Sequence, residues 1–572
     1  MGVKPRASTQ AVQAVAAQQS SHPDPQPDAM PTLTWAPLLS IAAAAFAVET
    51  PFFFRGTPSG HDLEFHLYSW LEVLGQWKIG ILYPRWAALA HFGYGEPRFI
   101  FYPPASWALG AALSAIFPWV LAPDIYIWLT LTAAGVSMFL LARQWFDRRD
   151  ATFAAVLYAI NPYHLVVIYW RSAFAELLAS SLLPLLLLLV LRAHEKGRRV
   201  TLPLALLLAC AWLINAPAAV MVHYSLALLI AMLVWWQRSP TSIFVGAAAI
   251  VLGAALAAFY LLPAVYEQEW VNITEAISAG SRPADNFLFA RTSEVDHDLF
   301  NRLISWLWVA EISLTVAAAW AGRKWRRRTP ALWYLLAVWA AACAVLVLPV
   351  TNPLWNVLPK LRFMQFPWRW MLCLSVPFTL FVAMGARRWT ARIAIYLAML
   401  CVLAYGWRHF QPPWWDNAAD LREMQDNMAT GAGYEGTDEY APIGADPSSI
   451  DRTARRVTVE GPAHAAIHVI QWKPELRVFT AEMSAGDQLA LHLFNYSAWR
   501  VEVNGRVVET GSREGTGQML VPVDAGINRV QVSFVRTWDR KVGAWISVLA
   551  LMLMIVFMLY RIELSWIPKA RE

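Results

Sequence analysis

The sequence has little charge for its length. Of 572 residues, 15% are Asp, Glu, Lys or Arg, whereas 58% are hydrophobic. A soluble domain has too little interior to bury that much apolar side chain, so the composition excludes a wholly soluble protein. Apolar stretches of about 18–22 residues recur along the chain, and each is long enough to cross a hydrocarbon core of roughly 30 Å.

Cysteine is also scarce. All four cysteines (Cys210, Cys343, Cys373 and Cys401) lie inside apolar stretches, so neither a disulfide framework nor a zinc site is expected. Basic residues form no continuous face on a soluble module, which excludes nucleic acid as a partner. The first hydrophobic run starts near Leu33 without a small-residue cleavage motif, so we expect it to remain as an anchor.

Basic residues instead gather in short loops, at 143–149, 192–199, 323–328 and 387–388. Such loops face the cytoplasm. We expect about twelve spans in the plasma (inner) membrane. With both termini in the cytoplasm, these spans put every one of the basic loops on the cytoplasmic side. The expected spans are 34–54, 124–142, 151–168, 174–192, 201–217, 218–236, 242–262, 302–321, 330–350, 368–385, 391–408 and 542–561.

These spans divide the chain into five parts. Residues 1–32 have the composition of a disordered cytoplasmic tail, and residues 33–408 form a transmembrane domain with a first external loop at 55–123. Residues 409–541 form an extracytoplasmic domain, followed by a final span at 542–561 and a cytoplasmic tail at 562–572. Residues 101–118 are short and start with a Pro pair, which favours a re-entrant or interfacial helix over a span.

The extracytoplasmic domain changes character along its length. Residues 411–449 are rich in Asp, Gly, Pro and Asn and are expected to be irregular. From Thr453 onward polar and apolar residues alternate, as in half-buried strands. Asn504-Gly505 between two such runs predicts a hairpin. The expected product is a small antiparallel β-sandwich that leads into the last span.

The densest polar group follows the first span, at residues 60–66. Asp62 and Glu64, with His61 and His66, could hold a divalent metal or supply a general base. In an extended loop the two carboxylates point to the same side, whereas on a helix Asp62 faces His66. The alternative is an amphipathic interfacial helix with its polar residues toward water.

A second polar group joins two spans. Asn161-Pro162-Tyr163 ends one span, and Arg171 and Glu176 open the next. Charges at the mouth of an apolar helix are costly unless they face a wet cavity or each other. The five-residue spacing of Arg171 and Glu176 puts them on different faces of a regular helix, so a simple ion pair between them is not expected. The alternative is a pair of interfacial anchors.

A third group, Arg362, Gln365 and Arg369, lies among aromatic residues on the expected outer side. Arginine there suits an anionic ligand, with phosphate the natural one, and interfacial anchoring is the alternative. Arg98, next to Tyr102 in the first loop, could add a further positive charge. Another pair of charged residues in an expected external loop, Glu267 and Glu269, is more simply explained as solvated than as acceptor contacts.

These motifs together resemble the GT-C class of membrane glycosyltransferases, which use polyprenyl-phosphate-linked sugars. More closely, four short motifs resemble a bacterial family called "6-pyruvoyl-tetrahydropterin synthase-related" membrane proteins: Gly60-His-Asp-Leu-x-x-His66, Tyr83-Pro-Arg-Trp86, Gly93-Tyr-Gly-x-Pro97 and Arg171-Ser-Ala-Phe-Ala-Glu176. The β-rich part is similar to that of YfhO-like proteins. The pterin synthase itself is a soluble enzyme with a three-histidine zinc site, and no such histidine cluster can be recognised in this sequence.

The resemblance implies a GT-C-like fold and a sugar transfer from a polyprenyl-phosphate donor to a glycan or protein acceptor on the outer face. It implies that Asp62 is a base or metal ligand, that Glu64 completes an Asp-x-Glu pair where the class more often has Asp-x-Asp, and that Glu176 belongs to a second acidic motif. Beyond a divalent metal at Asp62 and Glu64, no cofactor is implied. Substrate-binding roles fall to His61, His66, Arg98, Tyr102, Arg171, Arg362, Gln365 and Arg369.

The alternative is a non-enzymatic protein, either a translocator of lipid-linked glycans or a scaffold in envelope assembly. Transporters show internal repeats and ionisable residues at the middle of the membrane. The sequence shows no repeat, and its ionisable residues lie at the external edge of the expected spans, which favours an enzyme.

Overall fold

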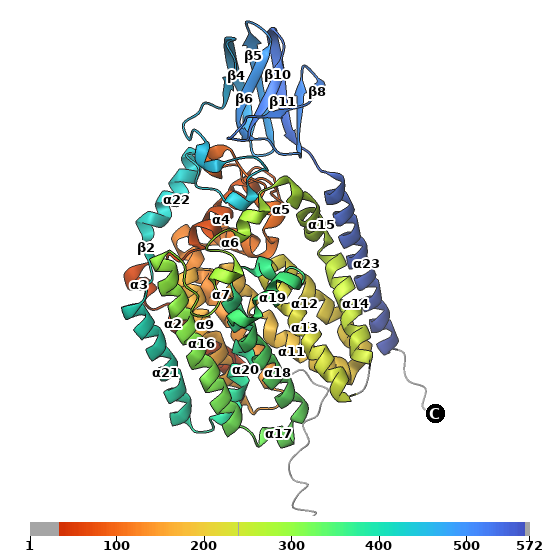
Figure 1. Ribbon diagram of the computed structural model, residues 1–572. Coiled ribbons are helices and arrows are strands. Elements are labelled where there is room, and N and C mark those ends of the chain that lie inside the picture. Colours follow the sequence, from red (N-terminus) through yellow and green to blue (C-terminus); the bar gives the residue numbers. More distant parts are fainter. Residues whose placement is uncertain (1–33, 238–239, 567–572) are drawn as a thin grey trace, which may run out of the picture.

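The computed structural model describes residues 34–237 and 240–566 as a helical bundle with a β-domain at one end (Figure 1). The expected N-terminal tail lies outside the described residues. The last helix, α23 (Trp538–Trp566), continues into the expected C-terminal tail, and the remainder of that tail also lies outside them.

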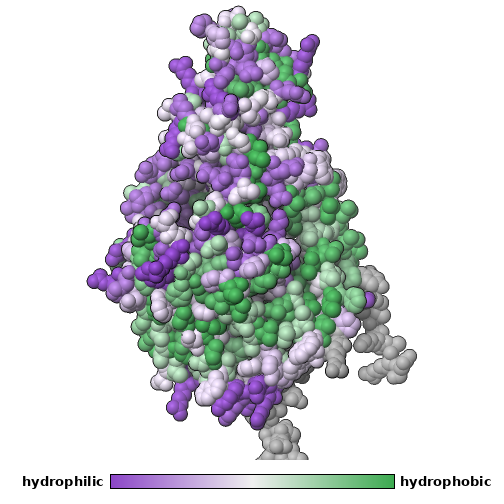
Figure 2. Space-filling model, in the orientation of Figure 1, coloured by the Kyte–Doolittle hydropathy of each residue, from purple (hydrophilic) through white to green (hydrophobic). Residues whose placement is uncertain are grey.

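The bundle confirms a polytopic α-helical membrane protein. Among the described residues, ten helical segments are long and apolar enough to cross a membrane, or twelve if each of two bent pairs is one span. On the face seen in Figure 2, an apolar belt crosses the bundle, with polar surface above and below it. The elements of these segments are α2 (Trp35–Val48), α3 (Phe52–Arg55), η2 (Trp119–Leu121), α7 (Ala122–Ala142), α8 (Arg148–Ala159), α9 (Pro162–Val166), η3 (Val167–Arg171), α10 (Phe174–Ala179), α11 (Leu182–Lys196), η4 (Gly197–Val200), α12 (Thr201–Ile214), α13 (Ala216–Gln237), α14 (Thr241–Leu256), α15 (Ala258–Tyr266), η5 (Glu267–Trp270), α16 (Val295–Ala321), α18 (Pro330–Leu346), η8 (Pro349–Thr351), α19 (Asn352–Val357), η10 (Pro367–Arg369), α20 (Trp370–Gly385), α21 (Trp389–His409) and α23.

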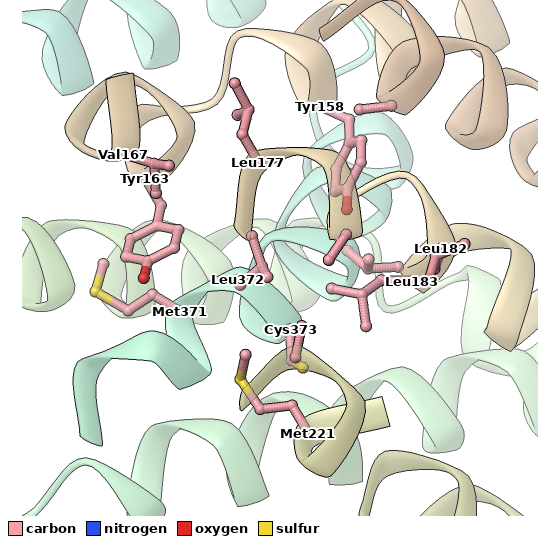
Figure 3. Close-up of a cluster of buried hydrophobic side chains, with 14 of the residues drawn as sticks. Tyr158, Tyr163, Val167, Leu177, Leu182, Leu183, Met221, Met371, Leu372 and Cys373 are labelled. Atoms are coloured by element: carbon pink, nitrogen blue, oxygen red, sulfur yellow. The ribbon is translucent and has the colours of Figure 1, made fainter. Parts of the chain in front are cut away.

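Helix α20 lies at the centre of the bundle, where 94% of its span is buried. It packs against α8, α16 and α18. Figure 3 shows the apolar side chains that it shares with its neighbours, including Met371, Leu372, Tyr163 and Leu177. This packing supports the segments that precede α10 and α20.

An acidic residue lies inside this bundle, contrary to the expectation from the sequence. Glu311 stands in the middle of α16 and has no exposed surface. Ionisable residues were expected at the external edge of the spans, and Glu311, between Ala310 and Ile312, is an exception to this expectation.

The first loop contains three helices, α4 (Leu63–Lys78), α5 (Arg98–Phe101) and α6 (Pro104–Ile116). With 13 residues, α6 is shorter than a membrane span. It packs against α4 and α7, so it covers α4 from the bundle side. Whether α6 enters the membrane stays a prediction.

The β-domain has two antiparallel sheets, ordered β3-β6-β10-β9 and β4-β5-β11-β7-β8. The predicted hairpin at Asn504-Gly505 is confirmed, since Val503 pairs with Arg506. Alternation along β6 buries Leu489, Leu491 and Leu493 between the sheets. The strands are β3 (Val457–Val459), β4 (Ala465–Lys473), β5 (Leu476–Met483), β6 (Asp487–Phe494), β7 (Trp499–Val503), β8 (Arg506–Val508), β9 (Gly511–Ser512), β10 (Gln518–Val523) and β11 (Gly526–Phe534).

The segment before the β-domain contains regular structure at residues 415–430, so the expectation of an irregular stretch at 411–449 is wrong for this part, whereas 411–414 and 431–449 contain only turns, single bridges and short 3-10 turns. It contains helix α22 (Ala418–Thr430), which begins with a capping box between Asn417 and Asp420. Such a box satisfies backbone donors at both positions and fixes the start of a helix. Before it, β2 (Trp415–Asp416) pairs with β1 (Thr57–Pro58) of the first loop. The connecting segment is therefore built onto the first loop.

A buried ion pair joins the ends of two spans, α15 and α23, and a hydrogen bond ties it to the β-domain. Glu267, just after α15, accepts from Nε and Nη2 of Arg540 at 2.6 Å each and from the Tyr496 hydroxyl at 2.6 Å. Glu267 has no exposed surface, so the prediction that it is solvated is wrong, whereas Glu269 is exposed. The partners of Glu267 are more than 200 residues away in the sequence, where no local pattern reveals them.

Candidate functional site

The start of α4 is held against the end of η3. The amide of Asp62 donates to the carbonyl oxygen of Arg171 at 2.9 Å, and the amide of Gly60 donates to the Ser172 hydroxyl at 2.9 Å. Ser172 has a left-handed backbone with φ of 48°, which ends the helical run and turns the chain toward α10. The two polar groups predicted from the sequence therefore meet in space.

Four charged side chains from three segments form two neighbouring ion pairs, and we call them the charged cluster. Nη2 of Arg171 donates to Oδ2 of Asp62 at 2.6 Å. Nε of Arg369 donates to Oε2 of Glu176 at 3.2 Å, and Tyr163 donates to Oε1 of Glu176 at 2.6 Å. As the sequence spacing indicated, Arg171 and Glu176 take different ion-pair partners.

Aromatic rings hold the two arginines beside each other. The guanidinium of Arg171 lies 5.0 Å from the ring centres of Phe366 and Trp368, and that of Arg369 lies 4.7 Å from Phe366. Nη1 of Arg369 donates to the carbonyl of Met364 at 2.7 Å and to Oε1 of Gln365 at 3.3 Å. These contacts hold both cations against the Phe366 ring.

One donor of the charged cluster is left open. Nη1 of Arg171 is buried and has no hydrogen-bond partner. An unsatisfied buried donor is costly, and a charged one more so. A ligand with an anionic oxygen would satisfy it with a charge-assisted hydrogen bond.

Asp62 is the member of the charged cluster that solvent reaches. Its side chain is 33% exposed, compared with 3% for Arg171 and 2% for Glu176. Burial raises the pKa of the Asp62 carboxyl, but the positive charge of Arg171 outweighs this, and the pKa is lowered below its ordinary value. Asp62 is therefore a carboxylate at neutral pH, placed where it can accept a proton from a ligand.

Two histidines and a tyrosine flank Asp62. Burial lowers the pKa of His61 and of His66 to about 4 in each case, so both imidazoles are neutral at pH 7. Nδ1 of His66 lies 3.4 Å from the Tyr102 hydroxyl, and the His61 ring packs edge-on against Phe300. These groups supply neutral hydrogen-bonding partners beside the charged cluster.

Three charged residues predicted for the site lie outside the charged cluster. Glu64 is exposed on α4, near enough to Asp416 for the two carboxylates to repel, and burial together with this repulsion raises the pKa of Glu64. Arg98 is buried in an ion pair with Glu96, with Nε to Oε1 at 2.5 Å. Arg362 is exposed.

The donor set does not fit the divalent metal considered from the sequence. Asp62 is engaged by Arg171, and Glu64 lies apart from it. In the described part of the chain, no group of three or more His, Cys, Asp or Glu side chains is placed to hold a metal ion. We therefore derive no step through a metal.

The family can be assigned from the sequence. The model of a family described as "6-pyruvoyl-tetrahydropterin synthase related domain; membrane protein" matches residues 99–409, more than half of the chain. The chain belongs to this family. The matched part includes Arg171, Glu176 and Arg369, and Asp62 precedes it.

Other comparisons add less. No curated protein matches the sequence. Among solved structures, the chain is similar to the oligosaccharyltransferase of Archaeoglobus fulgidus, crystallised in complex with zinc and sulfate, at 13% identity and a TM-score of 0.34. The similarity covers 70% of this chain and 54% of that one, so the chain spans about half the length of that protein.

Some features of the site in this family member escaped the sequence analysis. Phe366 and Trp368 were noted only as aromatic neighbours of the basic residues, although alternating aromatic and basic residues are a signal for cation–π contacts. The left-handed turn at Ser172 had no signal, because serine gives no conformational hint comparable to glycine.

Gly60 should be irreplaceable, because a Cβ at this position would lie 2.5 Å from the backbone carbon of Arg171. We expect Gly60→Ala to separate the two segments, to weaken the Asp62–Arg171 pair and to lower thermal stability. Unfolding followed by intrinsic fluorescence in detergent, compared with Gly75→Ala on α4, checks this, since a Cβ at Gly75 meets nothing within 4 Å. Equal stability of the two variants would contradict the packing argument.

Proposed function

We propose that this protein transfers a sugar from a polyprenyl-phosphate donor to an envelope acceptor on the outer face of the membrane. The observation that carries the proposal is the open, buried donor of Arg171 next to the accessible carboxylate of Asp62. The first group suits the phosphate of a donor, and the second suits the hydroxyl of an acceptor. The resemblance of the motifs to GT-C enzymes supports the same reaction.

In the proposed reaction the acceptor oxygen attacks the anomeric carbon of the sugar. The bond from that carbon to the phosphate oxygen breaks, and the phosphate leaves with the electron pair. The acceptor proton passes to the Asp62 carboxylate as general base. Arg171 and Arg369 stabilise the negative charge that grows on the phosphate, which is the main electrostatic demand of the transition state.

The ion pair of Asp62 and Arg171 implies that the donor binds before Asp62 acts as a base. While Arg171 is unoccupied, its charge keeps the pKa of Asp62 low and the carboxylate a weak base. A donor phosphate that binds Arg171 neutralises part of this charge and raises the basicity of Asp62. The base is then strongest when the donor is in place.

The outer-face location rests on the distribution of basic residues. The helix α17 (Trp325–Arg328) carries three arginines and lies at the end of the bundle opposite the β-domain (Figure 1). Basic loops favour the cytoplasmic side, which leaves the β-domain and the first loop outside. The same argument supports a cytoplasmic α17. The bacterial inner membrane is proposed from the resemblance of the motifs to a bacterial family.

A second candidate is a translocator or scaffold that binds lipid-linked glycan without turnover. The buried Glu311 within α16 favours it, because ionisable residues inside spans mark transport paths. Purified protein in lipid vesicles, supplied with a panel of polyprenyl-phosphate sugars, separates the candidates. Release of polyprenyl phosphate with transfer of the sugar supports the enzyme. Movement of the intact donor across the vesicle membrane, without release of polyprenyl phosphate, supports the translocator.

The pH dependence of the reaction should show whether the positive charge of Arg171 lowers the pKa of Asp62. Because the pKa of Asp62 is lowered, kcat/KM of the wild type should stay level from pH 8 to pH 5. In Arg171→Gln, burial remains while the positive charge is lost, so the pKa of Asp62 rises and the acid limb moves upward into this range. Arg362→Gln removes an exposed arginine and should retain the wild-type profile. Identical profiles for all three proteins would contradict the role of Arg171.

A further inference from the structure

A hollow lies away from the charged cluster, where the β-domain meets the spans. It has a volume of about 1000 Å³. The loop after α4, the bend between α14 and α15, the end of β11 and the first turns of α23 surround it. In Figure 1 the β-domain meets the upper ends of α15 and α23, and the upper edge of the apolar surface in Figure 2 lies at about this level.

The lower wall of this hollow is apolar and belongs to the spans. Leu256 and Phe259 come from the bend between α14 and α15, and Trp545, Val548 and Leu551 come from α23. Trp545 is 68% exposed and Leu551 is 46% exposed. Such side chains face hydrocarbon in a membrane protein, so the hollow is open toward lipid chains.

The upper wall carries an excess of positive charge. Arg85, Arg536 and Lys541 line it, opposed by one carboxylate, Glu475. Arg540 also lines it, but its charge is taken up by the buried pair with Glu267 described above. Three cations thus face one anion at the level where lipid headgroups lie.

Two polar groups in the upper wall have no partner. Nη1 of Arg85 and the hydroxyl of Tyr83 are both buried without a hydrogen bond, and the Arg85 guanidinium lies 4.1 Å from the centre of the Tyr83 ring. Buried donors of this kind are normally satisfied. Their position beside the cationic wall points to an acceptor oxygen that enters the hollow.

We propose that this hollow binds an anionic membrane phospholipid, with the phosphate held by Arg85, Arg536 and Lys541 and the acyl chains lying along α23. The excess of positive charge favours an anionic lipid over a zwitterionic one. The apolar wall favours a lipid over soluble phosphate, which has no acyl chain to place against it. The bound lipid bridges the first loop, the β-domain and α23. This site shares no residue with the charged cluster and does not depend on the proposed reaction.

Binding of phosphatidylglycerol and of phosphatidylcholine to the full-length protein in detergent micelles tests the site, with native mass spectrometry and fluorescent lipid titration as readouts. Each cation near a membrane surface contributes about fivefold in affinity for anionic lipid. The exposed pair Arg536→Gln/Lys541→Gln should therefore weaken phosphatidylglycerol binding by roughly tenfold or more. Arg455→Gln/Arg506→Gln removes the same charge from exposed positions of the β-domain and should leave binding unchanged.

Two further arms identify the ligand. Trp545→Ala, at an exposed position of the apolar wall, should weaken phosphatidylglycerol binding, and millimolar inorganic phosphate should fail to displace the lipid. Equal binding of both lipids by the wild type, or equal losses in the two double variants, would overturn the proposal. Displacement by inorganic phosphate together with wild-type lipid binding in Trp545→Ala would overturn it in favour of a soluble-anion site.

Discussion

Replacing Asp62 with asparagine should lower the rate of sugar transfer by about 10²- to 10⁴-fold, the contribution of a well-placed general base. The amide has the size of the carboxylate but cannot take up the proton of the acceptor. It also leaves Arg171 without its counter-ion, so donor binding should persist or strengthen. Single-turnover transfer and donor binding, measured on the same preparation in lipid, separate the two effects.

Glu64→Gln is the matched control for this experiment. Glu64 lies two residues from Asp62 but is exposed and outside the charged cluster, so its variant should transfer sugar at close to the wild-type rate. Equal activity of Asp62→Asn and wild type would remove Asp62 from the chemistry. A loss confined to Glu64→Gln would reassign the base to the carboxylate that the geometry disfavours.

Replacing Glu267 with leucine should destabilise the protein by about 3–5 kcal/mol, the usual cost of leaving one partner of a buried ion pair unpaired. Arg540 would keep its charge, with 3% of its surface exposed, and Tyr496 would lose its acceptor. Since the three residues belong to the spans and the β-domain, we expect the β-domain to detach first. Limited proteolysis of the β-domain and thermal unfolding in detergent measure this.

The control for position 267 is its neighbour Glu269, which is exposed, so Glu269→Leu should change stability little. The double variant Glu267→Leu/Arg540→Met removes both charges and should recover most of the loss, because an apolar pair often replaces a buried ion pair without penalty. If Glu267→Leu alone were as stable as wild type, the buried pair would not hold the β-domain.

The membrane part of the fold was predictable because each span can be recognised from its own local sequence. Apolar length and basic loops fix the spans without knowledge of their partners. The hairpin at Asn504-Gly505 is equally local, since two residues determine its turn. Helix α22 was missed although Asn417 and Asp420 form a capping pattern, because the surrounding Gly, Pro and Asp residues outweighed it in the composition.

The charged cluster was only half predictable. The residue types and their positions near span ends pointed to Asp62, Arg171, Glu176 and Arg369, but the pairing among them did not follow from spacing. Asp62 and Arg171 are 109 residues apart, and Glu176 and Arg369 are 193 apart. Such partners are brought together by tertiary packing. Arg98 and Glu96 are only two residues apart, but the segment around Thr437, to which Arg98 also donates, lies 339 residues further along the chain.

The pairing of β1 with β2 also has a consequence for biosynthesis. Thr57 pairs with Asp416 and Pro58 with Trp415, so the strand in the first loop waits for its partner until 416 − 57 = 359 further residues have been made. At roughly 5–20 residues per second, this wait lasts about 20–70 s. A nascent chain that stops between the end of α21 and Trp415 has made every span that precedes α23, yet the strand in its first loop still lacks its partner.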